Sequence, residues 1–485
     1  MTLALFRIAP NDSTATALRD LEAGEQALGV TLAAPVAKGH KVAVKPIAAG
    51  ESVLKFGFPI GVATRDIAPG EHVHTHNVST ALKGSGDYAF APSAQEDAGF
   101  EGPGFLGYRR ANGRVGTRNE IWVIPTVGCV GRTAQKIAER AAVLYASKID
   151  GVHAFPHPFG CSQLGDDLQG TRAILSALAN HPNAGGVLIV GLGCENNQIK
   201  GMLEGINHPN LRTLGAQMAS DEIEEGLALV EELVAGAQAE RTPAPLSELV
   251  LGVKCGGSDG FSGLTANPLV GRMADAVTGA GGTAILTEIP EIFGAEQLLM
   301  ARASDEAVFD GIVHMVNDFK DYFVRNGEPV SENPSPGNIA GGITTLEEKS
   351  LGAVQKAGHA TVTDVIPYGG QVRRKGLTLL EAPGNDAVSS TALAAAGATA
   401  ILFTTGRGTP LGFPVPTIKI ASNHDLATRK PGWIDFDAGQ VLEDGMDSAA
   451  DALLDTIAAI ASGRETAAER NGEREIAIWK RGVTL

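Results

Sequence analysis

The stretch from Lys254 to Pro268 concentrates side chains that can do chemistry. Within nine positions it holds an ammonium, a thiol, two hydroxyls and a carboxylate, contributed by Lys254, Cys255, Ser258, Asp259 and Ser262. Interspersed glycines let backbone N–H groups approach a ligand closely. An apolar run, Leu249–Val253, precedes the stretch, and a helix-like segment opens near Asn267. Open α/β sheets place ligand-binding groups at such strand ends, so we predict a functional site here.

The four cysteines share one kind of position. Cys129, Cys161, Cys194 and Cys255 each follow an apolar run and stand beside a glycine. Cysteines at such turns of a large intracellular chain favour metal ligation, acid chemistry or nucleophilic chemistry over disulfides. The alternative for any single one is a compact buried hydrophobe.

Three histidines alternate in Glu71–Asn77. If this segment is a strand, His72, His74 and His76 share one face. Neutral imidazoles are common ligands of transition metals, so the trio is a candidate metal or substrate site. Histidines that only make local hydrogen bonds on a surface strand are the alternative.

Several polar residues elsewhere are suited to an anionic, hydroxylated ligand. Arg118 and Asn119 close a run of arginines and glycines before an apolar strand, and Arg407 follows another buried strand. Arginine binds carboxylates in a bidentate manner. Asn338 lies in an irregular loop that enters a helix, where anions are attracted.

Acidic residues follow the expected strand at residues 283–286. Glu288 and Glu291 can meet at one turn and divide acid and base roles, while helix capping is the alternative. Thr345 and Glu348 fit a capping box, so we expect a structural role for Glu348.

The order of apolar runs and helical patterns predicts an α/β fold. Residues 1–93 read as a small β-rich domain, and residues 94–104 as a linker rich in Gly and Pro. Strands then alternate with helices over 105–245 and 246–485, which predicts two α/β domains with largely parallel sheets, the second of them Rossmann-like.

Composition excludes several functional classes. The formal net charge is −16. Nucleic-acid binding needs a clustered basic surface, so this charge argues against a nucleic-acid partner. No apolar run reaches the roughly 18 residues of a membrane span, and Met1–Asn11 shows no signal-peptide pattern. We therefore expect a soluble, cytoplasmic protein without nucleic-acid or membrane partners. Neither a dinucleotide-binding glycine pattern nor a phosphate loop is present.

These motifs together resemble the altronate and galactarate dehydratase family over nearly the whole chain. The resemblance rests on Gly107-Tyr108-Arg109, Gly116-Thr117-Arg118-Asn119, Gly191-Leu192-Gly193-Cys194-Glu195, Cys255-Gly256-Gly257-Ser258-Asp259, Ser262-Gly263, Ala266-Asn267-Pro268, Gly337-Asn338 and Glu348-Lys349-Ser350-Leu351-Gly352. His74-Thr75-His76-Asn77 resembles the SAF-like domain of that family. Family members differ in the loop around Cys129, so the resemblance gives the weakest support for a role of this cysteine.

The resemblance implies a metal-dependent hydro-lyase that converts a sugar acid to a 2-keto-3-deoxy sugar acid. The implied cofactor is a divalent metal, usually Fe2+, with Mn2+ or Mg2+ as alternatives. The family also includes enzymes that eliminate sulfite from sulfolactate. Two further alternatives are a sugar-acid-binding protein without turnover and a hydro-lyase whose iron–sulfur cluster is held by three of the four cysteines.

On this basis we assign roles to the candidate residues. The expected catalytic residues are His74, His76, Cys255, Ser258 and Asp259. The expected substrate contacts are Arg118, Asn119, Lys254, Ser262, Asn267, Asn338 and Arg407. The expected metal ligands are His72, His74, His76, Cys161, Cys194 and Cys255. The partner is a small-molecule sugar acid, and assembly into a homo-oligomer stays open.

Overall fold

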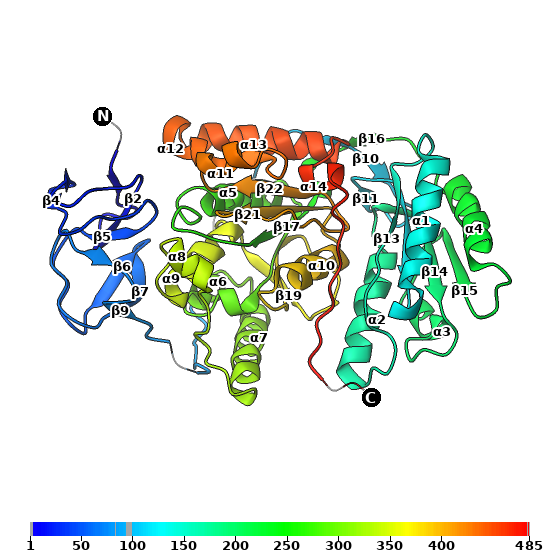
Figure 1. Cartoon of the computed structure of the whole chain (residues 1–485), viewed down its shortest axis with the longest axis horizontal. Coiled ribbons are helices and arrows are strands. Elements are labelled where there is room, and N and C mark those ends of the chain that lie inside the picture. Colours follow the sequence, from blue (N-terminus) through cyan, green and yellow to red (C-terminus); the bar gives the residue numbers. More distant parts are fainter. Residues whose placement is uncertain (1–2, 83, 94–98, 483, 485) are drawn as a thin grey trace.

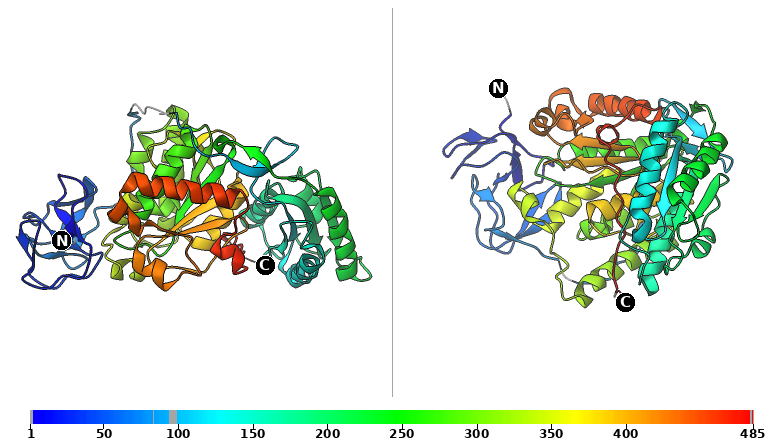
Figure 2. Two further views of the ribbon diagram at one scale, coloured as in Figure 1. Left: turned by 90° about the horizontal axis from the view of Figure 1, so that it is seen from above. Right: turned by 45° about the vertical axis from the view of Figure 1, so that its right-hand side comes forward.

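The computed structural model describes residues 3–82, 84–93, 99–482 and 484 of the chain. Three bodies lie in a row, with the N-terminal domain at the left of Figure 1, the C-terminal domain in the centre and the second domain at the right. The views in Figure 2 show the same order. The C-terminal domain is therefore the body that both other domains contact. Of the expected linker 94–104, residues 94–98 lie outside the described part of the chain.

The N-terminal domain is built from short antiparallel strands. One sheet has the order β1-β2-β5-β8, a second has the order β6-β7-β9, and β3 pairs with β4. The strands are β1 (Leu5–Phe6), β2 (Thr14–Ala17), β3 (Gln26–Ala27), β4 (Val30–Thr31), β5 (Lys41–Ala43), β6 (Ser52–Lys55), β7 (Phe58–Ala63), β8 (His72–Val73) and β9 (Val78–Ser79). The strand expected to carry three histidines ends at Val73, because the Asn77 side chain accepts the His74 N–H and closes a turn.

The second domain is a four-stranded parallel sheet of order β13-β12-β14-β15 with helices between its strands. Its elements are β12 (Glu120–Pro125), α1 (Gly131–Tyr145), β13 (Gly151–Ala154), α2 (Gly165–Ala179), β14 (Ala184–Gly191), α3 (Ile199–Leu203), β15 (Leu211–Gly215) and α4 (Glu222–Gly236). A small antiparallel sheet of β10 (Phe105–Arg109), β11 (Val115–Gly116) and β16 (Thr242–Ala244) lies where the chain enters and leaves this domain.

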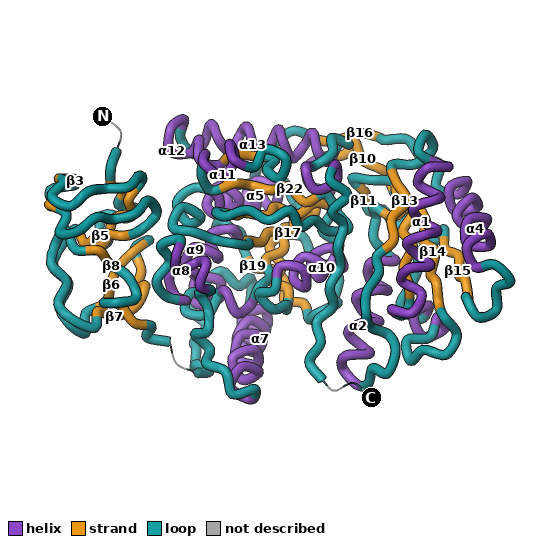
Figure 3. Tube along the Cα trace, viewed as in Figure 1, coloured by secondary structure: helices purple, strands orange, loops and turns teal. Residues whose placement is uncertain are grey.

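The C-terminal domain contains seven parallel strands in the order β19-β20-β18-β17-β21-β22-β23. They are β17 (Val250–Cys255), β18 (Thr283–Leu286), β19 (Val362–Ile366), β20 (Gly376–Leu380), β21 (Ala400–Thr405), β22 (Thr417–Ala421) and β23 (Phe436–Asp437). β17 lies in the centre of this sheet, and all but its first residue are buried. The expected α/β fold class with a β-rich N-terminal domain and parallel sheets is thus confirmed. Figure 3 shows the strands of the N-terminal domain and the mixture of strands and helices in the other two domains.

Helices cover both faces of this sheet. α5 (Ala266–Gly279) and α13 (Met446–Ala461) pack into the larger core on one face, and α10 (Asp386–Ala396) packs on the other. The remaining helices are α6 (Glu296–Met300), α7 (Glu306–Arg325), α8 (Pro336–Ala340), α9 (Leu346–Val354), α11 (His424–Arg429), α12 (Val441–Asp444) and α14 (Ala467–Arg470). No helix among the described residues is long and apolar enough to cross a membrane.

The domains are joined by different kinds of contact. Trp122 and Ile124 of the second domain share one apolar core with Leu393 and Phe403 of the C-terminal domain. The N-terminal domain also shares an apolar core with the C-terminal domain, since Val53 and Ile60 belong to the same cluster as Leu346. Buried ion pairs add to this interface, because Lys41 and Lys55 both reach Glu348 on α9.

Candidate active site

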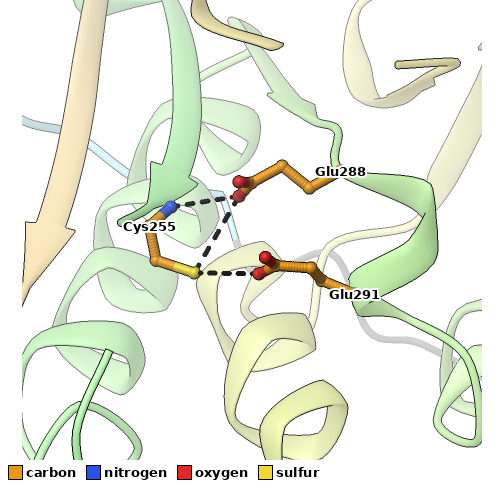
Figure 4. Close-up of side chains that lie close together, drawn as sticks. All are labelled: Cys255, Glu288 and Glu291. Atoms are coloured by element: carbon orange, nitrogen blue, oxygen red, sulfur yellow. Dashed lines mark hydrogen bonds between the residues drawn. The ribbon is translucent and has the colours of Figure 1, made fainter. Parts of the chain in front are cut away.

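The carboxyl ends of β17 and β18 bring Cys255, Glu288 and Glu291 together (Figure 4). Cys255 is the last residue of β17. After β18, Glu288 adopts a left-handed backbone conformation with φ of 67° and turns the chain into a short 3-10 helix that ends at Glu291. A non-glycine residue in this region is strained, and such strain clusters at functional sites.

The three side chains form a compact, buried group. The Cys255 Sγ lies 3.4 Å from Glu291 Oε2 and 3.9 Å from Glu288 Oε2. Glu288 also accepts the backbone N–H of Cys255 at 3.1 Å. Their candidate ligand atoms lie within 4.8 Å of one another.

Three buried lysines surround this group. Lys254 forms an ion pair with Glu288 at 3.0 Å and donates to Asp386 at 2.8 Å. Lys356 lies 2.9 Å from the Cys255 sulfur and 3.2 Å from Glu288. On the other side, Lys349 of α9 donates to Glu291 at 2.9 Å. Three carboxylates therefore face three ammonium groups, and no uncompensated negative charge remains for a dication.

The surroundings set the protonation of the thiol. Burial raises the pKa of Cys255 to about 12, although Lys356 acts in the opposite direction. The pKa of Lys356 is itself raised, despite its burial, by the nearby thiol and carboxylates. Burial opposes the charge on Glu288, but Lys254 and Lys356 outweigh it and lower the pKa of that carboxyl. The centre thus pairs a neutral thiol with charged carboxylates and ammonium groups.

A cavity of about 410 Å³ opens beside the thiol. This volume lies in the usual range for a small-molecule site. Its polar lining is Cys255, Ser258, Glu291, Asn333, Ser335, Asn338, Lys349, Asn385 and Asp386. The cavity therefore offers one ammonium, acidic groups and several amides and hydroxyls to a polar ligand.

Some predicted residues lie at this cavity and others support it. Ser258 and Asn338 line it, and the Asn338 amide also donates to the Ser258 carbonyl at 2.8 Å. Lys254 lies behind the wall, bonded to Glu288 and Asp386. Arg407 is exposed and donates to the Gly337 carbonyl at 3.0 Å, next to Asn338.

Asp259, Ser262 and Asn267 do not line this cavity but a separate pocket of about 20 Å³. The Asp259 carboxylate accepts hydrogen bonds from Ser262, Ser422 and Asn423 and from the Phe261 N–H. Asn267 bonds the Gly352 carbonyl and Thr404. These side chains hold the loop after β17 in shape, because buried polar groups need such partners.

Two glycines of the loop serve domain docking. A Cβ at Gly260 would lie 1.9 Å from the Gly39 carbonyl oxygen, and one at Gly263 would lie 2.7 Å from the Phe56 ring. Both neighbours belong to the N-terminal domain. Any side chain here would therefore push that domain away from the loop.

The histidines of the N-terminal domain form a cluster at the same interface. The ring centroid of His72 lies 5.4 Å from that of His74 and 5.5 Å from that of His76, although the residues do not share a strand. His40 joins them, with its Nδ1 3.1 Å from His72 Nε2. The cluster contacts the Ala340 carbonyl and Thr344 of the C-terminal domain rather than the lining of the cavity.

The histidine cluster has the donor type that suits a transition metal, whereas among the described residues the ligand atoms within 4.8 Å of one another are those of Cys255, Glu288 and Glu291. Burial, followed by neighbouring cations, lowers the pKa of His72 and of His74 to about 4, so both imidazoles are neutral at pH 7. Neutral imidazole is the form that binds a metal. Cys255, Glu288 and Glu291 are already paired with lysines, so an ion there would have to displace an ammonium group.

Arg118 and Asn119 are not brought to the cavity. Arg118 makes a bidentate pair with Glu469 and donates to the carbonyls of Thr117, Ile460 and Arg464. Asn119 bonds Arg110 and the Ala237 carbonyl. The run of arginines and glycines thus anchors the second domain to the C-terminal helices.

Comparisons with known proteins cover all three domains. Family models match for the "Altronate/galactarate dehydratase SAF domain" at residues 3–81, the "D-galactarate dehydratase/Altronate hydrolase, second domain" at 107–238, and the "D-galactarate/Altronate dehydratase, C-terminal" at 246–484. The chain is 48% identical to an altronate dehydratase of Bacillus subtilis over 99% of this chain and 100% of that protein. The chain belongs to this family.

Two further relatives come from Escherichia coli. An altronate dehydratase is 51% identical over 98% of both chains. A galactarate dehydratase (L-threo-forming) is 33% identical over 90% of this chain and 88% of its own. The expected resemblance is confirmed, and this member of the family carries all three domains on one chain.

Several residues at this site were not predicted from the sequence. Lys356 approaches Cys255 from 101 positions away, and no local motif marks it. Lys349 belongs to the family motif at residues 348–352. Its ion pair with Glu291 depends on the position of α9, which the motif does not reveal. His40 follows a single glycine, and only strand pairing of β5 with β8 brings it to His72.

Three of the four cysteines lie outside this site. Cys129, Cys161 and Cys194 are exposed and belong to the second domain, while Cys255 is buried in the C-terminal domain. The three follow strands of one sheet, and Cys255 ends a strand of another. Cys161 and Cys194 therefore do not join Cys255 as ligands of one metal.

Proposed function

We propose that the chain removes water from altronate or a closely related sugar acid and yields a 2-keto-3-deoxy acid. The chain is a sugar-acid dehydratase of the hydro-lyase class, as its full-length similarity to altronate dehydratases indicates. The observation that carries the proposed site is the cavity beside Cys255, where Glu291 and Lys349 form an ion pair in the wall. Such a pair offers a proton acceptor and a binding group for a carboxylate.

The cavity wall accounts for substrate binding. Lys349 supplies the positive charge for the sugar carboxylate, and it is already oriented by Asn333 and Asn338 at 3.1 and 3.2 Å. Ser258, Ser335 and Asn385 face the same space and are suited to the hydroxyls of the substrate. Arg407 and Lys254 support this wall from outside the cavity.

The proton transfers are assigned to Glu291 and Cys255. Glu291 accepts the C2 proton, the C2–H electrons form the C2–C3 double bond, and the C3–O bond breaks. The neutral Cys255 thiol supplies the proton with which the hydroxyl leaves as water, and Lys356 at 2.9 Å stabilises the thiolate. Protonated Glu291, after exchange with solvent, then gives a proton to C3 while the enol hydroxyl gives its proton to the Cys255 thiolate, so the enol becomes the 2-keto acid and both residues return to their initial states. Two groups with opposite protonation in one site are what this elimination requires.

The proposed metal site is the histidine cluster. His40, His72, His74 and His76 are nitrogen donors, which favour Fe2+ or Mn2+ over Mg2+. When bound, such an ion would supply a Lewis-acidic centre at the domain interface, apart from the lining of the cavity beside Cys255. The chain's own residues hold the cluster against the C-terminal domain through His74–Thr344 and His40–Ala340.

A substrate panel with site variants tests this function. The metal-loaded chain is incubated with altronate, galactarate and sulfolactate, and products are identified by NMR. We expect a 2-keto-3-deoxy acid from a sugar acid, and a loss of about 10²- to 10⁴-fold for Glu291→Gln, the usual scale for a general base. Glu232→Gln, which changes an exposed ion pair on the second domain, is the matched control. Release of sulfite alone, or binding without turnover, would contradict the proposal.

A further inference from the structure

The three cysteines of the second domain converge at one edge of its sheet. Cys129 follows β12, Cys161 lies between β13 and α2, and Cys194 follows β14, and these three strands are neighbours. The strands are parallel, so their carboxyl ends meet. All three thiols are free and exposed. This placement is independent of the cavity beside Cys255.

Hydrogen bonds tie the three loops into one structure. The Gly128 N–H donates to the Phe159 carbonyl at 2.9 Å, which places the Cys129 loop against the Cys161 loop. The Asn197 N–H donates to the Gly160 carbonyl at 3.0 Å. The Ser162 N–H donates to the Asn196 side chain at 2.7 Å, which joins the Cys161 loop to the Cys194 loop. Each cysteine therefore stands within two residues of a bond between loops.

The Cys161 loop is held in a costly conformation. Ser162 has φ of 54°, a left-handed value that a serine rarely adopts. Next to it, the Gln163 side chain is 3% exposed and accepts the Gly160 N–H, but its Nε2 has no hydrogen-bond partner. A buried, unpartnered amide N–H beside a thiol indicates a missing acceptor.

The spacing of the thiols distinguishes between ligands. Among the described residues, the only group of three potential ligands within 4.8 Å of one another is Cys255, Glu288 and Glu291. Three thiolates on one zinc ion, at bonds of about 2.3 Å, lie about 4 Å apart. The cysteine trio is not such a group, so as placed it does not fit a single zinc ion. Three thiols at one edge of a sheet are suited to a larger inorganic group, whose own sulfides accept hydrogen bonds from the protein.

We propose that Cys129, Cys161 and Cys194 bind an iron–sulfur cluster on the second domain. The thiols lose their protons and ligate three irons of a cubane cluster, and the fourth iron has no cysteine ligand. Gln217 donates to the Cys194 sulfur at 3.5 Å and stabilises the thiolate. The Gln163 amide supplies a hydrogen bond toward the cluster.

Iron and sulfide analysis of the whole chain tests this site. The chain is purified without oxygen, reconstituted with ferrous iron and sulfide, and analysed for iron, zinc and acid-labile sulfide together with its visible absorption. We expect about four sulfides per chain, and about four irons beyond any Fe2+ that the histidine cluster holds. Cys161→Ser and Cys194→Ser should lose both, while Cys255→Ser, the matched control, keeps both. Sulfide-free protein, zinc in place of iron, or loss of the cluster only in Cys255→Ser would overturn the proposal.

Alkylation of the cysteines in the wild-type chain tests the same site without any variant that could fail to fold. In the reconstituted wild-type chain, Cys129, Cys161 and Cys194 should resist alkylation, and all three should react after the cluster is removed. Because the three are exposed in the protein alone, equal reactivity before and after removal would overturn the proposal. Neither readout depends on dehydratase activity.

Discussion

Glu348→Gln tests how the N-terminal domain is held. The Glu348 carboxylate pairs with Lys41 at 2.9 Å and with Lys55 at 2.8 Å, and the side chains of the two lysines are 0% and 3% exposed. The substitution keeps the size and a hydrogen-bond acceptor but leaves two buried ammonium groups without their counter-charge. Breaking a buried pair in this way costs about 3–5 kcal/mol.

The pKa of Glu348 gives a matching magnitude. The two lysines outweigh burial and lower this pKa from 4.5 to about 2, and that difference corresponds to about 3 kcal/mol. Because the folded pKa lies below the unfolded one, the stabilisation is complete above about pH 4.5 and disappears as the pH falls toward about 2. Burial lowers the pKa of Lys41 to about 8, so deprotonation of this lysine limits the loss in the variant.

Thermal unfolding and limited proteolysis measure the effect. We expect Glu348→Gln to release the N-terminal domain at a lower temperature than wild type and to make residues 84–93 and 99–104 more sensitive to protease. The difference from wild type should shrink between pH 4.5 and 2, the range of the Glu348 shift. Glu347→Gln is the control, since Glu347 contacts the same domain through Thr80 and the Ala81 N–H without a lysine. If both variants behave alike across pH, the ion pairs do not hold the domains together.

Three further predictions address the site and its supports. Arg118→Ala should lower the free energy of unfolding by about 3–5 kcal/mol, because Glu469 loses its buried partner Arg118. The folded fraction of this variant should keep the wild-type KM. A raised KM would support Arg118 as a substrate contact. The double variant His72→Ala with His74→Ala should bind at least about tenfold less Fe2+ or Mn2+ than wild type, as measured by metal analysis. His314→Ala, on the exposed face of α7, is the control. Equal metal content in the two variants would exclude the histidine cluster as the metal site. Lys349→Met should raise KM for the sugar acid by about tenfold or more, because the substrate carboxylate loses its ammonium partner; an unchanged KM would contradict that role.

Much of the fold could be predicted because the signals are local. Apolar runs that end in Gly and Cys mark the strand ends of both parallel sheets, and β17 and β18 lie where these runs place them. Cys255 and Ser258 were correctly predicted to lie at one site for the same reason, since Cys255 ends the central strand β17 and Ser258 closely follows it. The histidine strand was predicted too long, because alternation alone does not reveal the turn that Asn77 closes.

The rest of the site depends on contacts between distant parts of the chain. Arg118 looked like a ligand for an anion because its partner, Glu469, lies 351 positions away. Asp259 was predicted to be catalytic, and the sequence did not reveal that Ser422 and Asn423 from another strand end donate to its carboxylate. A polar residue in a Gly-rich loop has the same local sequence whether it faces a ligand or anchors the loop, so only the folded partners distinguish the two roles.

The most direct test of the dehydratase site is the reaction of altronate with wild-type chain and Glu291→Gln in D2O. NMR follows the loss of altronate and the appearance of product. We predict that wild type forms a 2-keto-3-deoxy acid with solvent-derived deuterium at C3, and that the variant forms it at least about 100-fold more slowly. A wild-type rate in Glu291→Gln, or no conversion of any sugar acid by the metal-loaded chain, would contradict it.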